Sequence, residues 1–151
     1  MNYYNEIKTK ILEEENYSRI KDYSKENHKV KTYFEIGKLL HEAGKHYGEN
    51  IIGQYAIKLQ TEFGKKYNKR TLYRIRQFYI TFKDSKVSPM GTQLSWSHFK
   101  VLLPIKEETK LYYYINIVST NNLTKRELKE KIKNKEYERV DEQTRLKIIN
   151  Q

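Results

Sequence analysis

The sequence contains no cysteine, which excludes disulfide bonds, thiolate nucleophiles and zinc sites built from cysteine. This composition is compatible with a reducing cytosol, so we expect a cytoplasmic protein. No apolar run approaches the length needed to cross a bilayer, and the N-terminal segment MNYYNEIKTK lacks the apolar core of a signal peptide. We therefore expect a soluble chain without a membrane partner.

Glycine and proline are also scarce, with six Gly and two Pro among 151 residues. The glycines are scattered and form neither G-x-G-x-x-G nor G-x-x-x-x-G-K-[ST], so no nucleotide-binding phosphate loop is expected. Alternating strand patterns, short Asn-Gly hairpin signals and internal repeats are missing too. Apolar residues recur instead at helical spacing, which predicts an all-α, multi-helix fold.

The helical periodicity also indicates how the chain is organised. We expect helices over residues 2–15, 52–63, 70–82, 96–103, 107–118 and 124–132, with a further helix from 136 onward. Another helix should begin at Lys31 and end either at Gly44 or at the Tyr47-Gly48 pair. The polar segment 16–30 either continues the first helix or forms a flexible link. The predicted domains are an N-terminal helix and linker at 1–30, a core domain at 31–139 and a C-terminal tail or linker at 140–151.

Positive charge is concentrated in one short part of the chain. From Lys65 to Lys86 there are eight Lys and Arg residues against the single acid Asp84, a net +7 out of +11 for the whole chain. Gly64 separates a predicted helix from this basic turn, and a second helix follows. Charge this concentrated favours an anionic partner, although a basic helix face is often merely solvated.

The second helix has two distinct sides on a helical wheel. Its apolar residues, which we expect to face the core, are Leu72, Ile75, Phe78, Tyr79 and Phe82. The opposite side carries Arg70, Tyr73, Arg74 and Gln77. Arginine and glutamine can read base edges with two hydrogen bonds each, and tyrosine can stack on a base or contact phosphate. Helix, turn and second helix thus predict a helix-turn-helix-like pair.

Several phrases of the sequence occur in order in a known family. They are YFEIGKLL at 33–40, FGKKYNKRTLYRIRQFY at 63–79, LSWSHFKVLLPIKEE at 94–108 and LTKRELKEKI at 123–132. Over residues 31–139 the chain resembles the helical N-terminal domain of the YhcG-type family, which usually precedes a PD-(D/E)xK nuclease domain. The resemblance implies a helix-turn-helix-like domain that binds DNA and accompanies a nuclease.

The chain departs from that family pattern at two helix starts. Leu123-Thr124 stands where the family has Trp-Ser, and Lys66-Tyr67-Asn68 stands where it tends to have Gly-Phe-Ser. Asn and Thr still cap helices, so we expect both helices to form. The nuclease domain would begin where this sequence ends, which indicates either a stand-alone version or part of a longer protein.

The remaining polar motifs favour structural roles. Glu127-Leu128-Lys129 matches the E-x-K of a nuclease site, but it falls inside a predicted helix rather than on a strand. His98 is expected to bond backbone at a helix start beside a buried Trp96. Arg76 lies on the flank of its helix, where Glu35 or Glu62 is the expected ion-pair partner. We therefore expect no catalytic residues, no metal and no cofactor.

The sequence as a whole favours a non-catalytic DNA-binding module, with duplex DNA as the partner. Lys65, Lys66 and Lys69 would hold phosphates, while Arg70, Tyr73, Arg74 and Gln77 would face the groove. The alternative is a protein-interaction or oligomerisation domain whose basic face only aids solubility, since Tyr and Arg are enriched at interfaces. A homodimer and a nuclease supplied by another polypeptide also remain open as partners.

Overall fold

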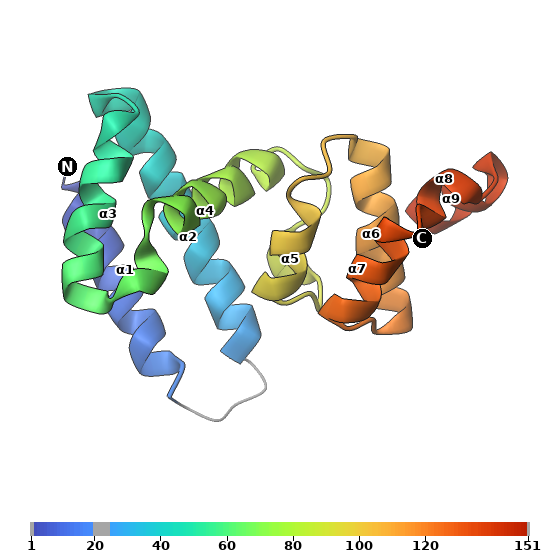
Figure 1. Cartoon of the computed structure of the whole chain (residues 1–151), viewed down its shortest axis with the longest axis horizontal. Coiled ribbons are helices and arrows are strands. Elements are labelled where there is room, and N and C mark those ends of the chain that lie inside the picture. Colours follow the sequence, from blue (N-terminus) through green and yellow to red (C-terminus); the bar gives the residue numbers. More distant parts are fainter. Residues whose placement is uncertain (1, 20–24, 151) are drawn as a thin grey trace. The chain divides into compact units, whose positions relative to one another are not determined.

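The computed structural model describes residues 2–19 and 25–150, and within those ranges every regular element is helical (Figure 1). This confirms the all-α prediction. The elements in chain order are α1 (Tyr3–Tyr17), α2 (Lys25–Tyr47), α3 (Asn50–Phe63), the 3₁₀ helix η1 (Lys65–Tyr67), α4 (Lys69–Phe82), the 3₁₀ helix η2 (Pro89–Gly91), α5 (Trp96–Leu102), α6 (Glu108–Asn121), α7 (Lys125–Lys133), α8 (Glu136–Arg139) and α9 (Glu142–Ile149).

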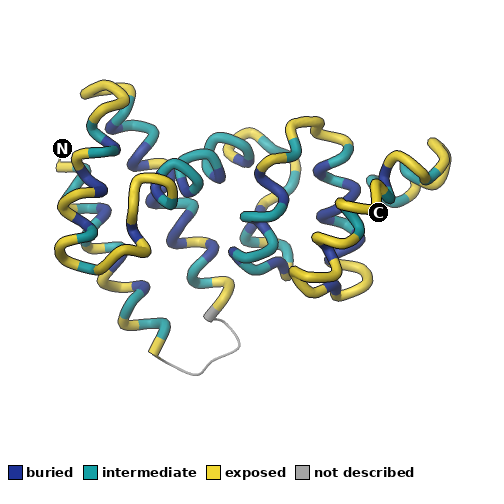
Figure 2. Tube along the Cα trace, viewed as in Figure 1, coloured by how far each residue is buried: buried dark blue, intermediate teal, exposed yellow. Residues whose placement is uncertain are grey.

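The chain packs as two compact units, Met1–Met90 and Gly91–Gln151. The first contains α1 to α4, and the second contains α5 to α9. This is a division by packing, and the domain boundaries predicted from the sequence stay a prediction. Along the longer helices buried residues recur at helical spacing, with half-buried or exposed residues between them (Figure 2).

Helix α2 forms the centre of the first unit, where it packs against α1, α3 and α4 (Figure 1). The core side of α4 is the predicted one, because Leu72, Ile75, Phe78 and Phe82 are all buried. Tyr79 is only half-buried and contacts the rings of Phe34 and His41 at the edge of the core. The core face of α4 therefore fixes which side of that helix remains exposed.

The contact between α2 and α4 depends on one glycine. A Cβ atom placed on Gly37 would lie 2.4 Å from the carbonyl oxygen of Ile75 and 2.8 Å from Cβ of Tyr79. Real Cβ atoms do not approach backbone oxygen so closely, so only a residue without a side chain lets the two helices meet here. Residues 33–40 (YFEIGKLL) thus form part of α2 and also supply Gly37, which permits the close contact with α4.

The second unit is organised around α6, which is buried on most of its circumference, including Tyr113, Tyr114 and Ile117. At the start of α5, the Ser95 side chain accepts from the His98 backbone, and Nδ1 of His98 accepts from Ser95 N–H at 3.0 Å. His98 also bonds the Leu123 carbonyl through Nε2 at 2.8 Å. Beside it Trp96 is buried, so the structural roles predicted for both residues are confirmed.

The C-terminal segment is also helical. Asp141 caps α9 by accepting from Thr144 N–H at 2.8 Å. From α6, the Asn116 side chain donates to the carbonyl oxygens of Ile148 and Ile149, at 2.6 and 3.0 Å, which satisfies acceptors near the end of α9. Residues 142–149 therefore pack against α6 as part of the second unit.

Candidate nucleic-acid interface

The turn between α3 and α4 is built from three local signals in the sequence. Gly64 ends α3 with φ +98°, a conformation that favours glycine. Asn68 begins α4 with its side-chain oxygen accepting from Thr71 N–H at 2.9 Å, so the N-cap expected at this departure from the family pattern is present. Between them η1 presents Lys65 and Lys66 on an exposed stretch of the chain (Figure 2).

Tyr67 anchors this turn to the rest of the first unit. Its side chain is fully buried, and its hydroxyl donates to Oε1 of Glu15 on α1 at 3.0 Å. Burial raises the pKa of Tyr67, and burial likewise raises the pKa of its hydrogen-bond partner Tyr33, on α2, to about 12. Both hydroxyls therefore stay protonated at neutral pH and can act as hydrogen-bond donors.

Glu15 also pairs with the turn itself. The Lys66 ammonium lies 2.5 Å from the same Oε1 atom that accepts from Tyr67. Burial acts to raise the pKa of Glu15, but the hydrogen bonds from Lys66 and Tyr67 outweigh it and hold that pKa below its usual value. An internal acid thus neutralises one of the three lysines predicted to hold phosphate.

Four other cations of the turn and of α4 lack such a partner among the described residues. Lys65, Lys69 and Arg70 are exposed, and Arg74 is half-buried. Within the described residues no carboxylate lies at ion-pair distance from any of these four side chains. An uncompensated group of cations on one surface creates a positive potential that attracts anions.

The structure therefore brings all seven predicted residues onto η1 and the non-core sides of α4. We call this surface the basic face: Lys65, Lys66, Lys69, Arg70, Tyr73, Arg74 and Gln77. Three members, Lys69, Tyr73 and Gln77, also have contacts within the helix. Lys69 Nζ and Arg76 Cζ lie 5.8 and 4.8 Å from the ring centroid of Tyr73, and Gln77 donates to Thr81 Oγ1 at 3.2 Å.

The predicted ion-pair partners of Arg76 are wrong. Arg76 Nη1 lies 2.5 Å from Oε2 of Glu49, just before the start of α3, whereas Glu35 pairs with Lys10 and Glu62 pairs with Lys8. The flank of α4 that carries Arg76 faces the end of α2, because the guanidinium would lie 3.7 Å from a Cβ atom on Gly44. Helical periodicity cannot identify this partner, since it depends on how three helices are packed.

The other candidate residues have structural explanations. Glu127 belongs to the capping box of α7: its carboxylate accepts from Thr124 N–H at 3.0 Å, and Thr124 Oγ1 accepts from Glu127 N–H at 3.1 Å. These bonds hold the pKa of Glu127 below its usual value. Among the described residues, no three His, Asp or Glu side chains are grouped so that they would hold a metal ion.

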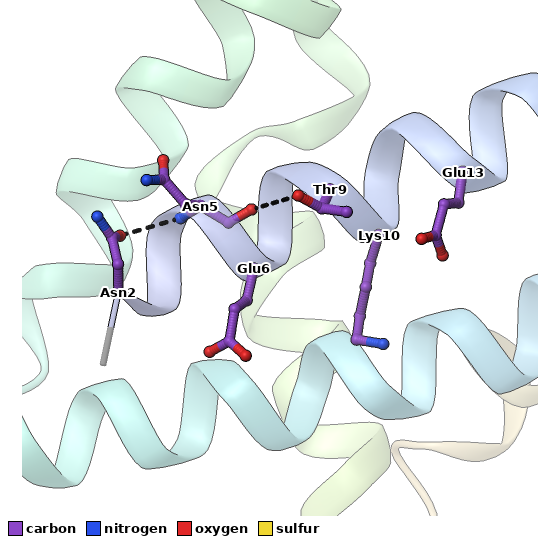
Figure 3. A pocket seen from close by; sticks show the side chains of 6 residues that line it. All are labelled: Asn2, Asn5, Glu6, Thr9, Lys10 and Glu13. Carbon is purple, nitrogen blue, oxygen red and sulfur yellow. Dashed lines mark hydrogen bonds between the residues drawn. The ribbon is translucent and has the colours of Figure 1, made fainter.

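A shallow hollow lies along α1, lined by Asn2, Asn5, Glu6, Thr9, Lys10 and Glu13 (Figure 3). Asn2 is the N-cap of α1, and the Thr9 hydroxyl bonds the carbonyl of Asn5. Lys10 reaches across to α2, where it pairs with Glu35 (Figure 3). Asn2, Thr9 and Lys10 therefore serve the helix start and the α1–α2 contact.

Two helical units and a basic turn between helices define a helical domain with a candidate anion-binding surface. The chain belongs to the DUF1016 (YhcG-like) family, because residues 6–139 match its N-terminal domain, which precedes a PD-(D/E)xK nuclease domain. The match includes α1 and so begins well before residue 31, where the resemblance described above begins. That N-terminal domain is distinct from the nuclease domain.

No curated protein and no solved structure matches the chain. In addition, none of the helices in the described ranges is both long and apolar enough to cross a membrane.

Proposed function

We propose that this chain is a non-catalytic DNA-binding module that contacts duplex DNA with the basic face. The observation that carries the proposal is the uncompensated charge of Lys65, Lys69, Arg70 and Arg74 on a turn and helix that contain no acid from Lys65 to Phe82. The phosphates of the DNA backbone carry the negative charge that would compensate these cations.

The order of elements supports a helix-turn-helix mode of binding. Helix α3, the short turn at η1 and helix α4 follow one another, and the core side of α4 is buried while Arg70 and Arg74 lie on its other side. In this mode the second helix enters the major groove with its N-terminal residues at the base edges. Arg70 and Arg74, one helical turn apart, would contact bases while the lysines of the turn hold phosphates.

Membership of the DUF1016 (YhcG-like) family suggests what DNA binding by this chain would serve. Its N-terminal domain precedes a nuclease domain, so we propose that this chain places a nuclease on DNA, whether that nuclease follows in the same polypeptide or acts in another. Glu127 does not serve as a nuclease residue in this account, because its carboxylate caps α7.

A protein-interaction module is the rival function, and exposed apolar side chains in the first unit favour it. Tyr47 and Ile57 are 56% and 68% exposed, so both are accessible to a partner protein. The two functions differ in which residues matter, since docking through Tyr47 or Ile57 does not need Arg70 or Arg74.

The charge-reversed double variant Arg70→Glu/Arg74→Glu separates the two. We expect it to lose binding to a labelled 20-base-pair duplex in fluorescence anisotropy, while its molar mass in light scattering stays that of the wild type. Lys58→Glu is the matched control, because Lys58 is exposed on the side of α3 that contacts Tyr4 of α1. Normal duplex binding by the double variant contradicts the proposal. So does a wild type that does not bind DNA, combined with a double variant whose oligomeric state is changed.

A further inference from the structure

A second group of cations gathers beside the basic face, on the flank shared by α2 and α4. His41 and Lys45 are one turn apart on α2, and Arg76 and Lys83 are two turns apart on α4. The His41 ring lies 5.7 Å from the ring of Tyr79, which holds the imidazole against α4. Arg76 reaches the same end of α2, since its guanidinium lies beside Gly44.

These groups influence one another electrostatically. Burial is the largest cause that lowers the pKa of His41, followed by the positive charges of Lys83, Lys45 and Arg76, while Glu42 acts in the opposite direction. Arg76 is neutralised by Glu49, whose side chain is 65% exposed. Lys45 and Lys83 are exposed, and within the described part of the chain neither lies at ion-pair distance from an acid.

The positive charges of Lys45 and Lys83 beside His41 disfavour its protonation in the free protein, and a bound anion would offset that repulsion. Lysine ammonium groups and a protonated imidazole all donate hydrogen bonds, and they are common ligands for phosphate oxygens. The group therefore has both the charge and the donors for a phosphodiester.

The position of this second group of cations around α4 can be compared with that of the basic face. At 100° per residue, Arg76 and Lys83 lie roughly 110–130° around the helix from the centre of the stripe formed by Arg70, Tyr73, Arg74 and Gln77. When a helix lies in the major groove, side chains at its flanks face the phosphate backbones that border the groove. The flank of α4 that carries Arg76 and Lys83 would therefore contact the DNA phosphate backbone, while the stripe from Arg70 to Gln77 contacts the bases.

We propose that His41, Lys45 and Lys83 form a second phosphate-binding site, which holds the DNA backbone alongside the groove occupied by α4. This inference rests on the proposed function, because it needs α4 to lie in the groove. A phosphate at this site would raise the affinity of His41 for a proton, so the protein takes up a proton when it binds DNA. Binding therefore strengthens as the pH falls from 8 to 6.

Two variants test this site in anisotropy titrations with a 20-base-pair duplex. Removing two phosphate contacts in Lys45→Ala/Lys83→Ala should make the slope of log K against log salt shallower by about 1.8, whatever the duplex sequence. His41→Gln should remove the strengthening between pH 8 and pH 6, which in the wild type is several-fold, with about tenfold as its upper limit, if the pKa of His41 rises by one unit on binding. Lys58→Ala should change neither.

A measurement on the wild-type protein avoids any effect of the variants on folding. The pKa of His41, followed by the NMR shift of its C2 proton, should rise when the duplex is added and stay unchanged with the same concentration of inorganic phosphate. An equal rise with inorganic phosphate alone would show a site for free phosphate and overturn the assignment to the DNA backbone.

The outcomes distinguish this inference from the proposed function. Duplex binding that depends on Arg70 and Arg74, combined with an unchanged salt slope in Lys45→Ala/Lys83→Ala and an unchanged pKa of His41, overturns the second site and leaves the proposed function intact. A wild type that does not bind duplex at low salt overturns both.

Discussion

Gly37 of α2 faces the carbonyl oxygen of Ile75 in α4 so closely that a Cβ atom on Gly37 would lie 2.4 Å from that oxygen. The Cβ atom would be bonded directly to the backbone of α2 and the oxygen belongs to the backbone of α4, so neither can move aside as the end of a flexible side chain would. This approach sets the distance between α2 and α4, and with it the position of the basic face relative to the core.

Gly37→Ala should therefore destabilise the protein. Alanine favours a helix over glycine by up to about 1 kcal/mol, but forcing α4 away from α2 typically costs about 1–3 kcal/mol, so we expect a net loss. Gly44→Ala is the matched control, because its Cβ would have ordinary contacts at 3.7 Å and should stabilise by about 0.5–1 kcal/mol. Urea denaturation measures both, and a Gly37→Ala protein as stable as Gly44→Ala contradicts this description of the crossing.

Tyr67→Phe should lower the free energy of unfolding by about 1–2 kcal/mol, since the buried hydroxyl bonds Glu15 and Tyr33 and both of these hydrogen bonds would be lost. Tyr73→Phe provides the comparison. Among the described residues the Tyr73 hydroxyl has no hydrogen-bond partner, so its removal should change stability by no more than about 0.5 kcal/mol. Equal stabilities for the two variants would show that Tyr67 does not anchor the turn.

Glu15 should contribute to stability in a pH-dependent way. Its pKa is lowered in the folded protein from the ordinary value of 4.5, so its contribution is fully present above that value and is lost as the pH falls through the folded pKa. Glu15→Gln should lower stability at pH 7 and flatten the fall in stability on acidification below about pH 5. Thermal melting from pH 7 to pH 3 measures this, and identical acid profiles for variant and wild type would contradict it.

The same substitution has an expected effect on DNA binding. Glu15 occupies the Lys66 ammonium in the free protein, so Glu15→Gln leaves that ammonium available to a phosphate. We expect tighter binding to duplex DNA and a salt slope steeper by up to about 0.9. Weaker binding, in a variant whose circular dichroism matches the wild type, would show that Glu15 instead holds the turn in the conformation that binds.

His98 should matter for the second unit alone. Its Nδ1 accepts from Ser95 N–H, and the geometry assigns a proton to Nε2, which donates to the Leu123 carbonyl. His98→Asn keeps an acceptor near Ser95 but is too short to reach Leu123, so we expect a loss of about 1 kcal/mol with unchanged duplex affinity. Loss of DNA binding in a folded His98→Asn protein would mean that this residue contacts DNA.

Local sequence signals predicted much of the fold. The apolar periodicity of Leu72, Ile75 and Phe78 gave the core side of α4 correctly, and the caps at Asn68, Ser95 and Thr124 mark the observed helix starts. These features depend on residues three or four positions apart, which a single sequence displays directly.

Contacts between residues far apart in the sequence could not be predicted from these local signals. Glu49 pairs with Arg76 and Glu15 with Lys66, over separations of 27 and 51 residues. The sequence alone does not distinguish these two acids from its other Asp and Glu residues as partners of Arg76 and Lys66. The role of Gly37 was hidden for the same reason, since a helical glycine looks unfavourable until the neighbouring helix is in place. The cations around His41 likewise come together only when α2 and α4 pack.

The most direct test of the account is the salt dependence of duplex binding by the wild-type protein. Fluorescence anisotropy with a labelled 20-base-pair duplex, at salt concentrations from 50 to 200 mM, gives the slope of log K against log salt. Because Lys66 is paired with Glu15, the phosphate contacts of Lys65 and Lys69 predict a slope of about −1.8 or steeper, at about 0.9 per phosphate neutralised. Absence of binding at 50 mM salt, or a slope near zero, would contradict the claim that this domain binds DNA through its basic face.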